Sequence, residues 1–198
     1  MLVKVCGITR VDDALAAVGM GADALGFIFW PGSPRFVDPF QARTIVAALP
    51  PFVAVVGVFV NQAADHVNGV AALARLTAVQ LHGDEDAAYA MAMTRPVVKA
   101  VSGAVDREDG WPERVMLLVD AHDLVQRGGT GRTADWSAAA QIAQKRRVIL
   151  AGGLNPDNVN DAVAHVRPFG IDVSSGVESS PGIKDRNRMA AFFKAVRS

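Results

Sequence analysis

The chain has 198 residues, 51% of them hydrophobic, and its 20 Lys and Arg residues balance its 20 Asp and Glu residues. This length and composition predict one domain, residues 1–198, with a full hydrophobic core. Balanced charge without like-charged blocks argues against nucleic acid or an anionic membrane as a partner, and no apolar run approaches the roughly 18 residues that span a bilayer. The expected partner is therefore a small molecule.

The chain holds one cysteine, which cannot form an internal disulfide, and its first residues lack the pattern of a secretory signal. We therefore expect a cytoplasmic protein. No spacing among the four histidines and the cysteine resembles a metal site, so no metal is expected.

Short apolar runs alternate with longer Ala-rich amphipathic segments, which predicts a parallel sheet whose strands are joined by helices. The strands are expected at residues 2–6, 24–29, 53–58, 78–81, 97–101, 115–119, 147–150 and 171–174. The helices are expected at residues 11–19, 39–48, 62–75, 85–92, 136–144, 156–164 and 185–196. Gly103, Gly110 and Pro112 interrupt the segment after the fifth strand, so the fifth helix is expected to be short or absent.

Eight strands at this spacing favour a single (β/α)8 barrel over the alternative, an open doubly wound sheet. Successive side chains of a strand point to opposite faces, so Lys4 and Cys6 are expected to face the barrel axis while Val3 and Val5 face the helices. The carboxyl ends of all strands meet at one mouth of a barrel. Asp120, at the end of the sixth strand, is therefore expected to reach the same mouth as Cys6.

Cys6 ends the first apolar run and precedes Gly7, the place where a strand becomes a loop. Catalytic groups of barrels lie at such positions, which makes the thiol a candidate base. A free thiol has a pKa of about 8.5, so a base role requires a nearby cation or loop amides that stabilise the thiolate. The alternative is a small buried hydrophobic side chain, which is the usual state of a lone cysteine.

Asp120 follows the apolar run 115–119 and shares a face with Leu118. An acidic side chain is costly to bury there without a partner or a purpose. A carboxyl group beside a dry pocket can hold a proton at neutral pH, which is the property a general acid needs. The structural alternative is a helix cap or a salt bridge.

Three glycines lie within Gly128-Gly129-Thr130-Gly131, between Asp120 and the next predicted helix. Glycine allows backbone conformations that a moving segment needs, and the position is on the mouth side of the sixth strand. We therefore interpret residues 123–133 as a candidate lid. An ordinary flexible connection is the alternative.

Glycine-containing segments also follow the last two strands, where barrels of this kind often hold a phosphate. Glycines let backbone amides approach phosphate oxygens closely, and a helix amino terminus adds a favourable field. The residues expected at the phosphate are Gly152, Gly153, Ser174, Ser175 and Gly176. The alternative is that either glycine segment is merely a turn.

Four further polar residues are placed near the expected mouth. Arg35 lies in a constrained loop after the second strand, where a guanidinium can bind a carboxylate through two parallel hydrogen bonds, although a solvated arginine is the alternative. Gln80 and His82 end the fourth strand on one face, and the histidine is expected to be a polar wall of the site. Asp172 is placed to bind a sugar hydroxyl or to orient the last loop.

These residues belong to short motifs that follow one another along nearly the whole chain. The motifs are Lys4-Val5-Cys6-Gly7-Ile8-Thr9, Gly26-Phe27-Ile28-Phe29, Ser33-Pro34-Arg35, Val79-Gln80-Leu81-His82-Gly83, Leu118-Val119-Asp120, Gly128-Gly129-Thr130-Gly131, Asp135-Trp136, Ala151-Gly152-Gly153-Leu154, Asp172-Val173-Ser174-Ser175-Gly176-Val177-Glu178 and Pro181-Gly182-Ile183-Lys184-Asp185. In this order they resemble the phosphoribosylanthranilate isomerases of tryptophan biosynthesis. An ordered set of this kind is far more specific than a single glycine motif.

The resemblance implies an Amadori rearrangement of N-(5-phosphoribosyl)anthranilate that uses no cofactor. It implies that Asp120 protonates the furanose ring oxygen and that Cys6 removes the proton from C2. It further implies that Arg35 holds the anthranilate carboxylate and that the two glycine-containing loops hold the phosphate. The single-barrel interpretation needs no partner chain, so a monomer or a weak homodimer is expected.

Three other classes of protein are the alternatives. The histidine-pathway isomerase performs the same rearrangement, but it resembles two similar half-barrels and typically has an aspartate where Cys6 stands. A pentose-phosphate epimerase would need metal-binding histidines and acids, which this sequence does not supply as a set. A non-catalytic sensor of a phosphorylated ligand would need neither an acid nor a base at the mouth.

Overall fold

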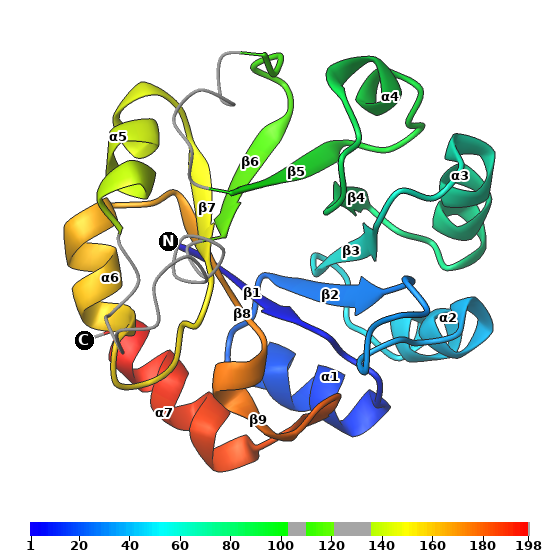
Figure 1. Ribbon diagram of the computed structural model, residues 1–198. Coiled ribbons are helices and arrows are strands. Elements are labelled where there is room, and N and C mark those ends of the chain that lie inside the picture. The colour runs from blue at the N-terminus through cyan, green and yellow to red at the C-terminus, as the bar shows by residue number, and fades with distance from the viewer. Residues whose placement is uncertain (103–109, 121–135, 198) are drawn as a thin grey trace.

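A computed structural model describes residues 1–102, 110–120 and 136–197. Eight parallel strands form a closed barrel in chain order, each hydrogen-bonded to the next, and the eighth returns to the first (Figure 1). The strands are β1 (Leu2–Cys6), β2 (Ala24–Ile28), β3 (Ala54–Phe59), β4 (Ala78–Leu81), β5 (Val97–Ser102), β6 (Met116–Asp120), β7 (Val148–Ala151) and β8 (Gly170–Val173). The (β/α)8 prediction is confirmed, and each predicted strand is found within one residue at either end.

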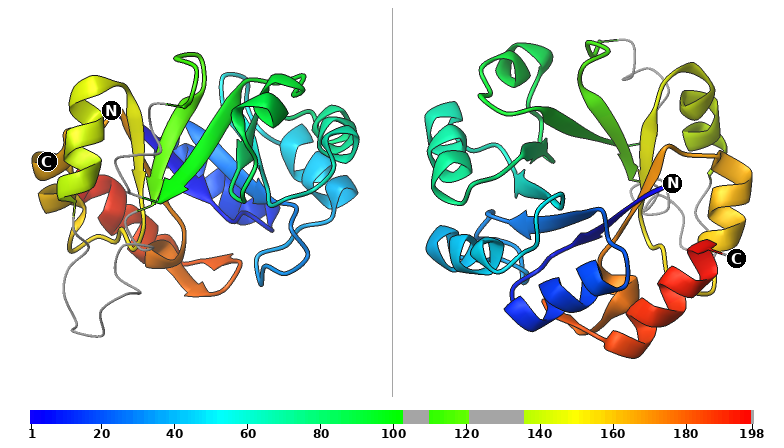
Figure 2. Two further views of the ribbon diagram at one scale, coloured as in Figure 1. Left: turned by 45° about the horizontal axis from the view of Figure 1, so that its top comes forward. Right: turned by 180° about the vertical axis from the view of Figure 1, so that it is seen from behind.

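The helices form a ring outside the strands, which Figure 2 shows from two further directions. They are α1 (Val11–Gly19), α2 (Pro39–Ala47), α3 (Ala64–Leu73), α4 (Ala87–Met91), α5 (Ser137–Lys145), α6 (Val159–Val166) and α7 (Arg186–Arg197). Between β5 and β6, the described residues 110–115 contain no helix. The candidate lid, residues 123–133, lies outside the described residues.

Polar side chains set several helix boundaries. Asp38 accepts hydrogen bonds from the amides of Phe40 and Gln41 at the start of α2, and the Asp86 side chain accepts from the amide of Tyr89 in α4. Such caps satisfy amides that have no partner within the helix. The predicted helix 85–92 therefore begins only after Asp86.

The alternation of side chains along the strands divides the interior into two layers. Val3 and Val5 pack in the large cluster between strands and helices, whereas Leu118 packs with Ile149 and Ala151 in a smaller, separate cluster. The expected parity is thereby confirmed for β1 and β6. One face of each strand packs against the helices, and the other lines the barrel interior and its mouth.

A short antiparallel hairpin after β8 is absent from the sequence prediction. It follows a single 3₁₀ turn, η2 (Ser175–Val177), and consists of β9 (Glu178–Ser180) and β10 (Ile183–Lys184). Gly182 supplies the turn with a φ of 79°, which favours glycine. Two- and three-residue strands leave too little apolar periodicity to be read from sequence.

Among the described residues, no helix has the length and apolar character needed to cross a bilayer.

Candidate active site

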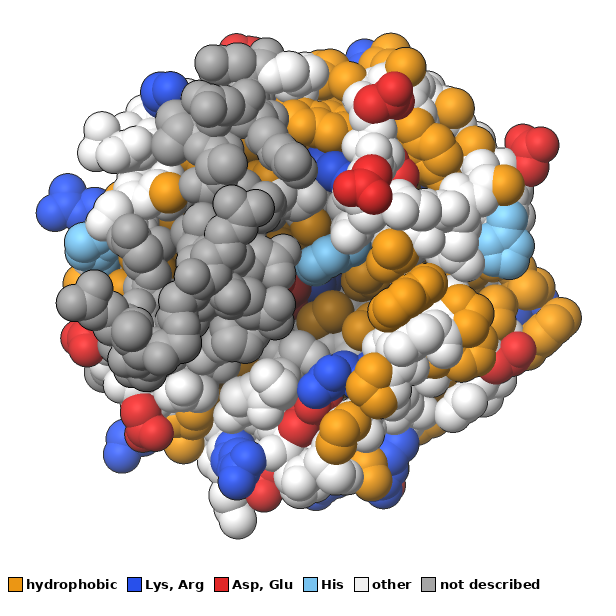
Figure 3. Space-filling view, viewed as in Figure 1, with side chains coloured by type: hydrophobic (Ala, Val, Ile, Leu, Met, Phe, Trp, Pro, Cys, Tyr) orange, Lys and Arg blue, Asp and Glu red, His pale blue; other side chains and the backbone are white. Residues whose placement is uncertain are grey.

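A pocket of about 200 Å³ lies at the carboxyl ends of the barrel strands. Figure 3 shows a hollow near the middle of the molecule with basic, acidic and histidine side chains beside it. The lining comprises Cys6, Ile28, Arg35, Val58, Gln80, His82, Leu118, Asp120, Ala151, Gly152, Gly153, Leu154, Asp172, Ser174 and Ser175. Every site residue predicted from the sequence is in this set except Gly176.

Cys6 is buried at the end of β1, opposite Gly26 of β2 in the strand register. A Cβ atom at position 26 would lie 2.7 Å from the Cys6 sulfur, so glycine is what leaves room for the thiol. Burial raises the pKa of the Cys6 thiol above its ordinary value, and the positive charge of Lys4 acts in the opposite direction. The thiol therefore has the nearby cation that a base role requires.

Lys4 and Asp172 form a buried ion pair next to this thiol, with 2.8 Å between Nζ and Oδ2. Burial alone would lower the pKa of Lys4, but Asp172 and Cys6 together more than offset this, so the pKa lies above its ordinary value and the ammonium keeps its proton. Asp172 is part of the pocket lining, and its Oδ1 atom is buried without a hydrogen-bond partner among the described residues. One oxygen of Asp172 thus binds Lys4, while the other is left for a further donor.

Asp120 faces His82 across the mouth, with 3.9 Å between Oδ2 and Nε2. The other ring nitrogen of His82, Nδ1, lies 3.0 Å from Nε2 of Gln80, as expected for two residues on one face of β4. Cys6 and Asp120 come from β1 and β6, which are far apart in the sequence, and both line the same pocket. A thiol and a carboxyl group are therefore available to one small ligand.

The loops after β7 and β8 form the wall on the other side. Gly152 and Gly153 have φ values of 94° and 65°, a region that favours glycine. Gly176 is not part of the pocket lining, and a Cβ atom at this position would lie 2.0 Å from the carbonyl oxygen of Leu154. The absence of a side chain at Gly176 lets η2 pack directly against Leu154 and Asn155.

Arg35 reaches the pocket from the loop after β2, but its guanidinium is already held by Glu178. Nε lies 3.0 Å from both carboxylate oxygens, and Nη2 lies 2.7 Å from Oε2. From the sequence, Glu178 is recognisable only as part of a motif and has no predicted role. Nothing local to either residue reveals a contact across 143 positions of the chain.

Within residues 1–102, 110–120 and 136–197, no group of three His, Cys, Asp or Glu side chains is arranged to hold a metal ion.

The closed barrel and the polar pocket at the carboxyl ends of its strands define the class of single-barrel (β/α)8 enzymes. Residues 3–195 match the family model of N-(5'-phosphoribosyl)anthranilate (PRA) isomerase. The chain belongs to this family of isomerases.

Individual relatives are similar to this chain over nearly their whole length. The chain is 47% identical over 199 residues to the N-(5'-phosphoribosyl)anthranilate isomerase of Geotalea uraniireducens, covering 98% of both chains. A solved phosphoribosyl anthranilate isomerase in complex with reduced 1-(o-carboxyphenylamino)-1-deoxyribulose 5-phosphate superimposes with a TM-score of 0.87 at 39% identity, covering 100% of this chain and 98% of that one. A monomeric form of the dimeric enzyme from Thermotoga maritima gives a TM-score of 0.84 at 38% identity, covering 100% of both chains.

Proposed function

We propose that the chain converts N-(5-phosphoribosyl)anthranilate, an aminoaldose, into the aminoketose 1-(2-carboxyphenylamino)-1-deoxyribulose 5-phosphate, a step of tryptophan biosynthesis. The observation that carries the proposal is that Cys6 and Asp120 line one pocket, together with Arg35 and Gly152-Gly153. That pocket offers a base, an acid and a binding group for each charged end of such a substrate.

Two proton transfers accomplish the rearrangement. Asp120, as the general acid, gives a proton to the furanose ring oxygen, the bond from that oxygen to C1 breaks, and the nitrogen lone pair forms a Schiff base. The thiolate of Cys6 then takes the proton from C2, and the electrons of that C–H bond give an enolamine. Tautomerisation of the enolamine yields the ketone, so the sequence of steps needs no oxidant, reductant or cofactor.

The base role of Cys6 depends on its thiolate form. Because burial raises the pKa of the thiol, only a small share is ionised near neutral pH, and the Lys4 ammonium increases that share. Lys4 is itself fixed by Asp172, so the positive charge stays next to the sulfur. A desolvated thiolate that does form is a strong base toward carbon acids.

Substrate binding is assigned to both ends of the pocket. The phosphate is placed at the amides of Gly152-Gly153 and Ser174-Ser175-Gly176, because positive φ angles at the first pair let the backbone approach an oxygen closely. The anthranilate carboxylate is placed at Arg35. The ribose hydroxyls, in the middle of the substrate, are assigned to Gln80, His82 and the second oxygen of Asp172.

Binding the substrate at both ends fixes its reacting carbon atoms between the acid and the base. Such positioning can lower the activation barrier by several kcal/mol, on the order of 7 in the best intramolecular cases.

At the level of the whole chain, we assign residues 1–198 to one catalytic domain that works in the cytoplasm as a monomer or a weak homodimer. Weak association is supported by the dimeric relative from Thermotoga maritima. Sedimentation velocity at rising concentration tests this assignment.

The deciding experiment for the activity is a steady-state assay on phosphoribosylanthranilate, generated in place because the compound is labile. We expect turnover with this substrate. The phosphoribosyl aminoaldose of histidine synthesis is assayed in parallel. Conversion of the second compound alone would overturn the proposal in favour of the histidine-pathway reaction.

A further inference from the structure

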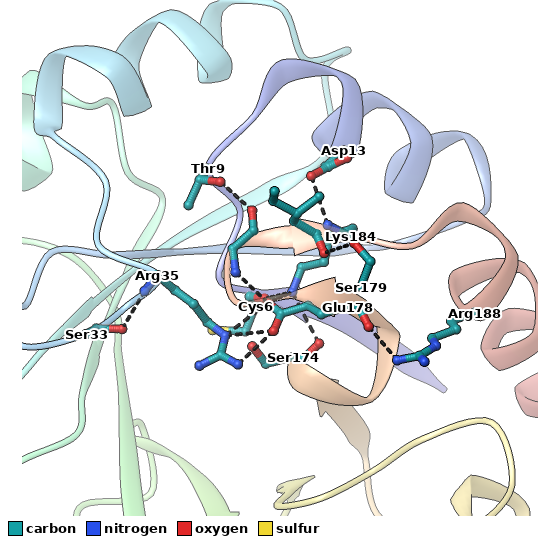
Figure 4. A network of polar contacts seen from close by, with 12 residues as sticks. Cys6, Thr9, Asp13, Ser33, Arg35, Ser174, Glu178, Ser179, Lys184 and Arg188 are labelled. Atoms are coloured by element: carbon teal, nitrogen blue, oxygen red, sulfur yellow. Dashed lines mark hydrogen bonds and ion pairs between the residues drawn. The ribbon is translucent and has the colours of Figure 1, made fainter.

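A second network of charges surrounds Glu178 at the start of the β9–β10 hairpin (Figure 4). Arg35 and Lys184 both donate to its carboxylate, and the Lys184 Nζ lies 2.8 Å from Oε1. The side chains of Glu178 and Lys184 are 4% and 0% exposed. A buried ion pair adds little stability over apolar side chains of similar size, so its presence beside a pocket points to a role in arranging the site.

Lys184 joins the ends of three strands. Besides Glu178, its ammonium donates to the carbonyl oxygen of Cys6 at 2.6 Å and to that of Ser174 at 3.3 Å. Its backbone amide donates to Asp13 of α1, which fixes the hairpin against the barrel. One cation therefore sets the relative positions of the proposed base, the proposed phosphate loop and Glu178.

Contacts fix Arg35 at its backbone, at the aliphatic part of its side chain (its stem) and at its guanidinium group. Its amide donates to the hydroxyl of Ser33 at 3.1 Å. Its stem lies against Gly7, where an added Cβ would be 2.7 Å from Cδ of Arg35. Its guanidinium donates hydrogen bonds from Nε and Nη2 to the Glu178 carboxylate. A guanidinium restrained in this way loses little further freedom when it binds a ligand.

The position of Glu178 decides which edge of the Arg35 guanidinium is open to a ligand. Glu178 occupies the Nε–Nη2 edge, and the planar Nη1–Nη2 edge carries two parallel N–H donors that point away from Glu178. Charge also favours an anion there, because Arg35, Glu178 and Lys184 together carry one net positive charge. Glu178 stays ionised: burial alone would raise its pKa, but the hydrogen bonds from Arg35 and Lys184 bring the pKa below its ordinary value.

We infer that Glu178 and Lys184 are positioning residues that hold Arg35 so that its Nη1–Nη2 edge receives the carboxylate on the aromatic ring of the substrate. The inference rests on the proposed function, since it names how that substrate's carboxylate is selected. Two parallel N–H···O bonds from one rigid edge demand a planar carboxylate in one orientation. Glu178 and Lys184 thereby act on specificity without touching the reacting atoms.

The test compares two inhibitors, reduced 1-(o-carboxyphenylamino)-1-deoxyribulose 5-phosphate and the same compound without its ring carboxylate, by calorimetry. In the unmodified protein the carboxylate should improve Kd by more than tenfold. In Glu178→Gln this ratio should fall about tenfold, since the orienting charge is gone. In Arg35→Ala the ratio should be lost, and adding Glu178→Gln to that variant should change it no further.

Glu85→Gln is the matched control, because Glu85 and Lys99 form a similarly buried pair, 2.8 Å apart, that does not contact Arg35. It should leave the inhibitor ratio unchanged. If Glu178→Gln does not fold, Glu178→Asp replaces it, since aspartate keeps the charge but its shorter side chain cannot hold the Nε–Nη2 edge in the same geometry. An unchanged ratio in either variant would overturn the inference, while absence of binding and turnover in the unmodified protein would instead overturn the proposed function.

Discussion

Lys4 and Asp172 lie opposite each other in the register of β1 and β8, and their side chains meet 2.8 Å apart beneath the Cys6 thiol. The pair places a positive charge beside the proposed base while the carboxylate keeps that charge in position. Removal of Lys4 is therefore predicted to act on both stability and catalysis, and the two effects are separable.

Lys4→Met should raise the pKa of Cys6 further, because the ammonium that opposes burial is lost. The rise of kcat/KM with pH should then move to higher pH, and moving that profile by one pH unit lowers the rate at a fixed pH about tenfold. Leaving Asp172 unpaired should also cost about 3 to 5 kcal/mol in the free energy of unfolding. A pH-rate profile and urea unfolding measure the two effects.

The double variant Lys4→Met/Asp172→Asn serves as the control. It leaves no buried charge without a partner, so most of the lost stability should return. Its pH profile should lie closer to that of the unmodified protein than the profile of Lys4→Met does, because the Asp172 carboxylate acts on the pKa of Cys6 in the opposite direction to Lys4. A profile of Lys4→Met identical to that of the unmodified protein would contradict the role given to Lys4.

Cys6→Ser and Asp120→Asn should each lower kcat by a factor on the order of 10² to 10⁴, the usual contribution of a positioned acid or base. Both replacements keep the shape of the side chain, so circular dichroism and inhibitor binding should stay close to those of the unmodified protein. Arg35→Ala should instead raise KM more than it lowers kcat, because Arg35 contacts no reacting atom. Near-normal turnover in Cys6→Ser would remove the base assignment.

The strands of the barrel were predictable because their apolar runs are short and alternate regularly with longer amphipathic segments. Parity along β1 then predicted that Lys4 and Cys6 point inward, and position at a strand end predicted that Cys6 and Asp120 share a mouth. The first relationship depends only on the local geometry of a strand. The second follows from the predicted barrel, in which the carboxyl ends of all strands meet at one mouth.

The contacts of Glu178 were not predictable in the same way. Its partners Arg35 and Lys184 lie 143 residues before it and six residues after it, and the β9–β10 hairpin that brings them together is too short for a periodic signal. The partner of Lys4 was missed for a similar reason, because pairing of the first and last strands appears only when the barrel closes. Sequence thus predicted which residues gather at the mouth, and tertiary structure added what holds them there.

Gly26→Ala is predicted to lower kcat without unfolding the barrel. The new methyl group would lie 2.7 Å from the Cys6 sulfur and 3.1 Å from Cε of Lys4, so the thiol and its cation must move. A displacement near 1 Å of a catalytic group can cost on the order of 100-fold in rate. Gly69→Ala on α3 is the control, because no atom lies within 4 Å of the added carbon; it should leave kcat unchanged and stabilise the helix by about 0.5 to 1 kcal/mol.

Lowering the pH should decrease the free energy of unfolding because of Glu178 and Glu85, whose pKa values both lie below the ordinary value of 4.5. For each, burial alone would raise the pKa, and hydrogen bonds from a buried cation and other donors more than offset it. A carboxylate with a lowered pKa in the folded state stabilises that state above its ordinary pKa, and this contribution is lost as the pH falls through the folded-state value. The free energy of unfolding should therefore decrease below about pH 4.5.

Urea unfolding between pH 7 and pH 3 measures this loss. In Glu178→Gln the slope against pH should be smaller than in the unmodified protein, because one of the two linked carboxylates no longer titrates. Glu178→Gln/Glu85→Gln should flatten the curve further, since the two ion pairs share no residue and their effects should add. An undiminished acid slope in the double variant would show that other carboxylates account for the acid sensitivity.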